Sequence, residues 1–336
     1  MKKNRLILIL GLLLLAATAC EKKADMKIAL MFPYTTSARM QFEEKYFKAK
    51  AAELNCEAII TDAKNDDVLQ RKQATELLQQ GVKVLIVMAV NAYTAAEIVR
   101  EAHNKGAYVI GYDRLIFNSD LDFYISHNNY NVGKYMAEYA LKHKPNGKYL
   151  LLGGDKGDRN AIFVKTGQLD ALAPSVSAGN VKIVLDVYVE EWLPLNAYHI
   201  MKEYLKLSAY DFPDVVLTSY DGLAYAARQA LDEAGITEDV IITGQDAEPQ
   251  AIKYILQGKQ TLTIYKPLKP LAENAVVTAV KLAKGEKPDT TTSIFNNRKR
   301  VPALLFEPIP VDKNNIRETV VKDGMFSEAE FNSLTK

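Results

Sequence analysis

Short, nearly continuous apolar segments alternate along the chain with longer segments whose apolar residues recur at helical spacing. In the first half, the expected strands are residues 27–32, 56–61, 82–90, 107–112 and 122–127, and the expected helices are residues 38–54, 66–80 and 91–105. Strands that are apolar on both faces are typical of parallel sheets, because helices cover both faces of such sheets. The pattern therefore predicts a doubly wound α/β unit.

The same alternation begins again after residue 130. The expected strands are residues 148–154, 181–189, 214–219, 239–244 and 261–267, and the expected helices are residues 131–144, 160–172, 194–207, 221–234, 248–256 and 268–282. The halves share an order of elements but no residue-by-residue repeat. We expect an α/β fold with two doubly wound parallel-sheet lobes.

The composition is that of an ordinary globular chain. It has 336 residues, of which 48% are hydrophobic and 25% are charged, and this length is enough for two domains. The net charge is +1 and the charges are scattered, so nucleic acid is not indicated as a partner. Neither half contains a G-x-G-x-x-G dinucleotide loop or a G-x-x-x-x-G-K-S/T phosphate loop.

The N-terminus has the features of a secretory signal. Residues 1–5 are basic, and the apolar run that follows is shorter than the roughly 20 residues of a membrane span. Its end, Ala-Thr-Ala-Cys, resembles a lipobox. We therefore expect residues 1–19 to be a lipoprotein signal peptide, Cys20 to carry lipid and residues 20–25 to form a tether. Ordinary signal cleavage beside an unmodified cysteine is the alternative. Cys56 begins an apolar run and is expected in the core.

Polar residues follow the carboxyl ends of expected strands in both halves, and open α/β sheets bind ligands at this edge. They are Arg39, Asp113, Arg114, Asp158, Asn160, Trp192, Asp221, Asp246 and Lys266. Carboxylates accept hydrogen bonds and arginines donate them in pairs, which suits neighbouring hydroxyls. A tryptophan face packs on the C–H face of a pyranose. The set therefore favours a neutral sugar as the ligand.

The sequence has no arrangement that is typical of an enzyme. It lacks a Ser-His-Asp set, a G-x-S-x-G elbow and a cysteine near a histidine. Its two cysteines and four histidines do not have metal-ligand spacing. We expect a binding protein without a cofactor or a metal.

Each candidate residue also has a structural interpretation. Asp113 and Arg114 are adjacent and could form a salt bridge within a loop. Asp221 and Asp246 each precede an expected helix and could cap it. Trp192 could pack in a hinge or in the core. The residues alone leave these alternatives open.

Several segments resemble the type I periplasmic sugar-binding proteins of ABC importers, and within them the branch that binds D-xylose. They are YDRLIFNSDLDFYIS (112–126), GGDKGDRNA (153–161), EEWLPLNAYHIM (190–201), GQDAEPQAIKYILQGKQTLTIYKP (244–267) and VDKNNIRETVVKDG (311–324). The resemblance covers nearly all of residues 27–324. It implies sugar contacts at Arg39, Asp113, Arg114, Asn160, Trp192, Asp221, Asp246 and Lys266, with Asp158 as a weaker candidate.

The resemblance also implies the partners. They are a monosaccharide, D-xylose foremost, and a membrane permease of the ABC type. The chain would be a monomer in the periplasm or cell envelope, held at the membrane by its lipid. Alternatively, the same fold would present a different sugar to a membrane kinase or chemoreceptor.

Two lobes joined by three crossings follow from the resemblance as well, with crossings near residues 127–129, 263–266 and 299–304. The first lobe would hold residues 26–128 and 266–298, and the second would hold residues 129–262 and 302–336. A ligand that contacts both lobes draws them together. The expected mechanism is capture, closure and delivery, with no bond made or broken.

Two positions and one short segment depart from the xylose-binding pattern. Met40 stands where the pattern has tryptophan, and Phe42 replaces that stacking surface only in part. Tyr220 stands where the pattern has asparagine, and residues 33–37 lack the expected charges. A buried polar group left unpaired costs roughly 1–3 kcal/mol. These departures therefore bear on which sugar is bound.

Overall fold

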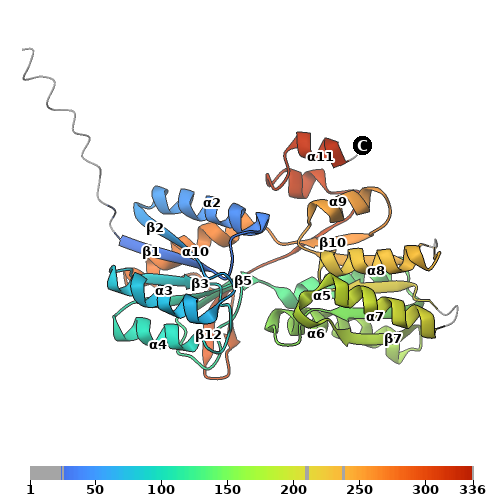
Figure 1. Cartoon of the computed structure of the whole chain (residues 1–336), viewed down its shortest axis with the longest axis horizontal. Coiled ribbons are helices and arrows are strands. Elements are labelled where there is room, and N and C mark those ends of the chain that lie inside the picture. The colour runs from blue at the N-terminus through green and yellow to red at the C-terminus, as the bar shows by residue number, and fades with distance from the viewer. Residues whose placement is uncertain (1–23, 25, 209–211, 237–238, 335–336) are drawn as a thin grey trace, which may run out of the picture.

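The computed structural model describes residue 24 and residues 26–208, 212–236 and 239–334. Two α/β lobes lie side by side along the long axis of the molecule and meet near the end of strand β5 (Figure 1). This confirms the predicted fold class. The expected signal peptide, Cys20 and all of the tether except residue 24 lie outside the described residues.

The first lobe is built on a seven-stranded sheet in the order β11-β12-β5-β4-β3-β1-β2. Its strands are β1 (Met26–Phe32), β2 (Cys56–Asp62), β3 (Val84–Val87), β4 (Tyr108–Tyr112), β5 (Phe123–His127), β11 (Thr292–Phe295) and β12 (Arg300–Phe306). All of its pairings are parallel except β11 with β12. Cys56 is buried at the start of β2, as expected.

Helices cover both faces of this sheet. They are α2 (Ala38–Glu53) and α10 (Leu268–Ala283) on one face, and α3 (Asp67–Gln79) and α4 (Ala96–Asn104) on the other. Alternate residues of β3 point to opposite faces. Val84 and Ile86 pack with α2 and α10, whereas Leu85 and Val87 pack with α3 and α4. The apolar runs of the sequence are therefore strands buried on both sides.

The second lobe is built on a six-stranded sheet in the order β13-β10-β9-β8-β6-β7. Its strands are β6 (Gly147–Gly153), β7 (Val181–Tyr188), β8 (Val215–Thr218), β9 (Ile241–Gln245), β10 (Leu262–Tyr265) and β13 (Ile309–Val311). Helices α5 (Asn129–His143) and α6 (Arg159–Ser177) cover one face, and α7 (Pro194–Leu207) and α8 (Asp221–Glu233) cover the other. The shorter elements are η1 (Glu190–Trp192), α9 (Pro249–Leu256), η2 (Arg317–Val321) and α11 (Glu328–Leu334).

Three short segments join the lobes. They lie between β5 and α5, between β10 and α10, and between β12 and β13. The prediction was wrong for the third crossing, because β12 pairs with β5 and Leu304 lies opposite Ile125. Residues 302–306 thus belong to the first lobe, where β12 lies between β11 and β5 in the sheet. Strand β10 extends the second sheet to Tyr265, beyond the predicted limit of residue 262.

Two glycines allow α5 and α6 to approach closely. A Cβ atom on Gly133 would lie 1.8 Å from the carbonyl oxygen of Val164, and one on Gly167 would lie 2.0 Å from that of Tyr130. The approach brings together the first turns of both helices, where Asn129 Nδ2 donates to Asn160 Oδ1 at 2.9 Å. In this way helix packing positions one of the candidate ligand residues.

Candidate functional site

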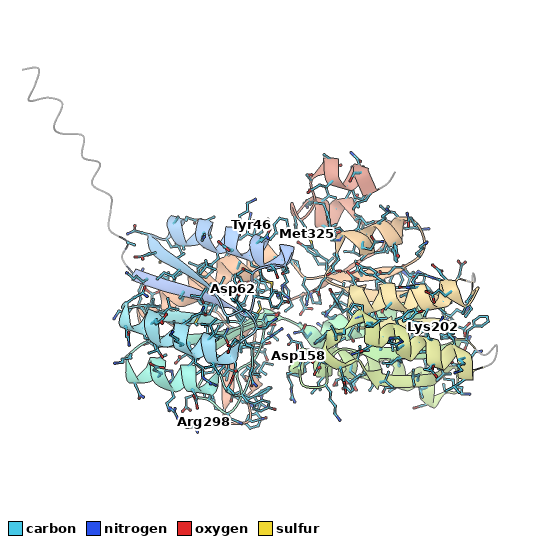
Figure 2. All side chains as sticks on the ribbon, in the orientation of Figure 1. Tyr46, Asp62, Asp158, Lys202, Arg298 and Met325 are labelled. Carbon is cyan, nitrogen blue, oxygen red and sulfur yellow. The ribbon has the colours of Figure 1, made fainter. Side chains whose placement is uncertain are left out.

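A cavity of about 580 Å³ lies between the lobes and is lined by residues from both. Its lining includes Tyr34, Arg39, Met40, Asp113, Arg114, Asp158, Asn160, Glu191, Trp192, Tyr220, Gln245, Asp246, Glu248, Lys266 and Met325. Asp158 lies between the lobes in Figure 2, and Met325 belongs to the C-terminal segment above them. Of the eight ligand residues expected from the sequence, all but Asp221 line this cavity, and so does the weaker candidate Asp158.

Asp113 directly follows β4 and is buried at the wall of the cavity. Its φ is 60°, in the left-handed region that aspartate tolerates better than most residues. Its backbone carbonyl accepts hydrogen bonds from Tyr124, Ser126 and Asn160 at 2.9, 3.1 and 3.2 Å. The last bond comes from the other lobe. Three hydrogen bonds therefore hold the strained backbone of Asp113 in place.

The carboxylate of Asp113 forms an ion pair with Arg39, which also lines the cavity. Its Oδ1 lies 3.2 Å from Arg39 Nη2, yet it has no hydrogen-bond partner among the described residues. Burial alone raises the pKa of Asp113, but the positive charges of Arg39 and Lys266 bring that pKa well below its ordinary value. Asp113 is thus an ionised acceptor that a donor in the cavity could satisfy.

Arg39 is oriented from behind by Glu43 on the same helix. Glu43 Oε1 accepts from Arg39 Nε and Nη2, both at 3.2 Å. Burial alone lowers the pKa of Arg39, but Asp113 and Glu43 raise it well above its ordinary value. The guanidinium therefore stays charged and directed at the cavity.

Arg114 does not form the salt bridge with its neighbour that was one interpretation of the sequence. Its Nη1 donates instead to the backbone oxygen of Ala89 at 3.0 Å, while the carboxylate of Asp113 pairs with Arg39. Adjacent residues in this turn point their charges at different partners. Both line the cavity.

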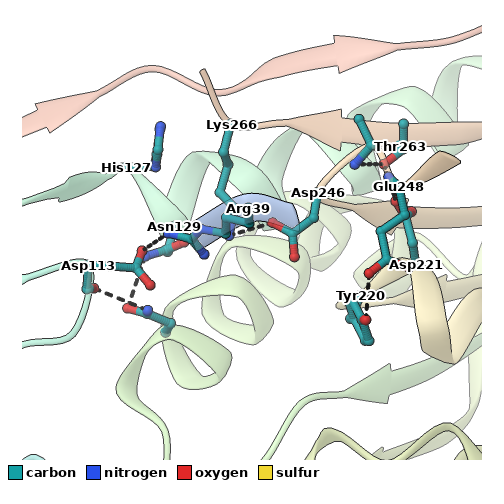
Figure 3. A network of polar contacts seen from close by, with 12 residues as sticks. Arg39, Asp113, His127, Asn129, Tyr220, Asp221, Asp246, Glu248, Thr263 and Lys266 are labelled. Carbon is teal, nitrogen blue, oxygen red and sulfur yellow. Dashed lines mark hydrogen bonds and ion pairs between the residues drawn. The ribbon is translucent and has the colours of Figure 1, made fainter. Parts of the chain in front are cut away.

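Lys266 and Asp246 supply a second ion pair, next to Arg39 (Figure 3). Lys266 Nζ lies 2.8 Å from Asp246 Oδ1. Asp246 follows β9 with a φ of 92° and does not cap α9, whose cap position is Glu248. Because Lys266 lies in the segment that crosses between the lobes, this pair sits at the base of the cleft.

Trp192 lies in a strained turn, and its side chain also packs against the hydrophobic core of the second lobe. It ends η1, where Glu191 and Trp192 have φ values of 54° and 57°. Asp155 fixes this turn by accepting a hydrogen bond from the Glu191 backbone at 2.5 Å. The indole lies against Gly154, where a Cβ atom would come within 2.2 Å of the ring. Only glycine leaves room for the indole there.

The structure does not bring Asp221 to the cavity. Its side chain is fully buried, and its oxygens accept from Gln260 Nε2, Thr263 Oγ1 and the Glu248 backbone at 2.9, 3.0 and 3.0 Å. It does not cap α8 either, because it lies inside the first turn after Tyr220. Asp221, which follows β8, is thus bonded to the segment after β9 and to the start of β10. These bonds satisfy its carboxylate.

Sequence reasoning missed Glu248. This residue lines the cavity only two residues after Asp246, at the carboxyl end of the same strand. The rule that selected Asp246 could have selected Glu248 as well. Tyr220 was noted only as a departure, yet it also lines the cavity.

The described residues give no sign of a metal centre or a membrane span. They contain no group of three or more His, Cys, Asp or Glu side chains that could hold a metal ion. Over the same part of the chain, every helix is too short or too polar to cross a membrane.

Comparison with known proteins identifies the family. Residues 28–287 match the family described as periplasmic binding protein domain. The chain is 38% identical over 328 residues to the D-xylose-binding periplasmic protein of Escherichia coli, which covers 98% of this chain and 99% of that protein. It is 37% identical over 326 residues to the protein of the same name from Haemophilus influenzae, with 97% and 98% covered.

A solved structure agrees. An ABC transporter solute binding protein from Clostridium phytofermentans, with bound β-D-glucose, superposes with a TM-score of 0.83 at 28% identity. The superposition covers 91% of this chain and 99% of that chain. These matches confirm the resemblance, and they indicate a binding protein rather than an enzyme. The chain belongs to the periplasmic binding protein family.

Proposed function

We propose that the chain captures a monosaccharide, D-xylose foremost, between its two lobes and delivers it to an ABC-type membrane permease. The observation that carries this proposal is the polar lining of the cavity, which comes from both lobes. Arg39 and Asp113 face it from the first lobe, and Asn160 and Trp192 face it from the second. A ligand held by both lobes favours their closure.

The chemistry of the lining supports a sugar. The carboxylates of Asp113 and Asp246 accept hydrogen bonds from hydroxyls, whereas Arg39, Arg114 and Lys266 donate them. The indole of Trp192 supplies the apolar surface that packs on a pyranose. The two relatives that carry the name D-xylose-binding periplasmic protein match almost the whole chain, which supports D-xylose as the first candidate.

We also propose that the protein works in the periplasm or cell envelope and is tethered there by lipid on Cys20. The basic start, the apolar run and the lipobox-like end of the leader support this anchor. Mass spectrometry of the protein purified from membranes would test it. A diacylated peptide that begins at Cys20 is the expected result, and an unmodified cysteine would reject the anchor.

Tryptophan fluorescence tests the ligand directly, because Trp192 is the chain's only tryptophan. Residues 21–336 would be titrated with xylose, arabinose, ribose, glucose and galactose. A saturable change in emission is expected with xylose. A response only to another sugar would keep the binding function and change its ligand. No response to any of the five, confirmed by calorimetry, would reject this proposal.

Substituting Gly154 tests whether Trp192 forms part of the sugar site. In Gly154→Ala the new Cβ displaces the indole, so we expect the affinity for the bound sugar to fall roughly fivefold or more, since an aromatic contact is worth about 1 kcal/mol. The emission of the free protein should shift as well. Lys156→Ala, an exposed change in the same loop, is the control. Equal affinities for all three proteins would exclude Trp192 from the site.

A further inference from the structure

The second lobe presents two aromatic rings at one corner of the cavity. Trp192 and Tyr220 come from different strand ends, and their ring centroids lie 6.5 Å apart with the planes at 85°. A Cβ atom on Gly222 would lie 2.4 Å from the Tyr220 ring and 3.1 Å from Pro194. Both rings therefore pack closely against glycines, Trp192 against Gly154 and Tyr220 against Gly222.

Glu248 lies next to Tyr220 at this corner and accepts hydrogen bonds from two tyrosine hydroxyls. Tyr220 Oη donates to Glu248 Oε1 at 2.7 Å, and Tyr225 Oη donates to Oε2 at 3.3 Å. Glu248 and Tyr220 line the cavity, whereas Tyr225 is not part of the lining. The backbone nitrogen of Glu248 donates to Asp221 at 3.0 Å. The carboxylate is thereby fixed in position from its protein side.

These bonds determine what the corner offers to a ligand. A carboxylate has about four acceptor sites, so two remain after the tyrosines are bound. The hydroxyl hydrogen of Tyr220 is used within the protein, which leaves only acceptor capacity on that oxygen. In place of the asparagine amide of the xylose-binding pattern, which both donates and accepts, this chain has a group that only accepts.

We propose that Tyr220 and Glu248 are specificity-determining residues that select a ligand with a free hydroxyl at one ring position. That hydroxyl donates to Glu248, while the Tyr220 ring sets the shape of the pocket around it. A deoxy or O-methyl group at the same position has no hydrogen to donate and leaves the carboxylate unsatisfied. The inference rests on the proposed function, since it assigns one subsite of the sugar pocket.

Calorimetry with sugar analogues tests the assignment. Wild type and Glu248→Gln would each be titrated with the preferred sugar and its full set of monodeoxy analogues. In wild type, the analogue that lacks the selected hydroxyl should bind roughly ten- to a hundredfold more weakly, as expected for a hydrogen bond to a charged group. In Glu248→Gln this difference should shrink by roughly tenfold, while discrimination at the other ring positions is kept.

Tyr225→Phe is the matched control, because it removes the other hydroxyl on the same carboxylate without altering the cavity lining. It should keep the wild-type pattern of discrimination. If Glu248→Gln weakens the sugar and every analogue by the same factor, Glu248 only supports the wall and the inference is wrong. Unchanged binding of every ligand would reject it too. A wild-type protein that binds none of the sugars would instead overturn the proposed function itself.

Discussion

Replacing Asp113 with asparagine is expected to lower the affinity for the sugar by roughly ten- to a hundredfold. The carboxylate is buried, and it faces Arg39 Nη2 at 3.2 Å. A hydrogen bond from a ligand hydroxyl to a charged carboxylate is worth about 1.5–3 kcal/mol, which corresponds to roughly ten- to a hundredfold in affinity. Asparagine keeps the size of the side chain and tolerates the left-handed backbone, so the loss reports on the charge rather than on a distorted turn.

Calorimetry on Asp113→Asn, Asp113→Ala and wild type would measure this loss. Asp120→Asn is the matched control, because Asp120 lies nearby on the chain but is exposed and pairs with Arg298. Binding as tight as wild type in Asp113→Ala would remove Asp113 from the site. Since its backbone carbonyl also joins the lobes through Asn160, a thermal melt of each variant is needed to show that the fold survives.

Seven of the eight ligand residues expected from the sequence line the cavity, because the expectation rested on one simple rule. Residues at the carboxyl ends of parallel strands meet at one edge of the sheet, and Asp113 and Asp246 follow β4 and β9 in that way. The rule does not say which carboxylate turns inward. Asp221 also stands at a strand end, but Gln260 and Thr263 surround it with donors that are distant in sequence.

The third crossing could not be predicted for a similar reason. Strand β11 has only four residues, and both β11 and β12 are partly exposed, so local sequence does not assign them to a lobe. What places β12 in the first lobe is its parallel pairing with β5, a contact between segments about 180 residues apart. The strained turns at Trp192 and Asp246 are likewise set by tertiary contacts. Local sequence carries little information about either.

Acidification is expected to destabilise the protein through His127, at the first crossing between the lobes. His127 is buried, and its Nε2 lies 3.0 Å from the backbone oxygen of Pro267 at the second crossing. Burial lowers its pKa from 6.5 to about 3, and the charges of Lys266 and Arg39 act in the same direction. The ring is therefore neutral at neutral pH, and its Nε2–H donates to the Pro267 carbonyl and joins two hinge segments.

The sign of the effect follows from this lowered pKa. In the unfolded chain the histidine takes up a proton below about pH 6.5, whereas the folded protein resists protonation until about pH 3. The stability that the neutral His127 contributes is thus fully present above the unfolded pKa. As the pH falls from about 6.5 towards about 3, this contribution is lost by about 1.4 kcal/mol per pH unit. Glu43, Asp158, Asp221 and Glu248 act in the opposite direction, because burial raises the pKa of each carboxyl.

A comparison of variants isolates His127 from these carboxyls. Gln in its place can still donate to Pro267 but does not titrate. Between about pH 6.5 and pH 4.5, wild type should lose about 2 kcal/mol more free energy of unfolding than His127→Gln, measured by denaturant titration. His143→Gln, at an exposed position near the end of α5, is the control for losing a histidine. If the free energy of unfolding fell equally with pH in wild type and His127→Gln, protonation of the buried ring would not destabilise the folded protein. The folded protein would then tolerate a protonated His127 between the crossing segments, and the inferred role of its neutral ring in joining them would be wrong.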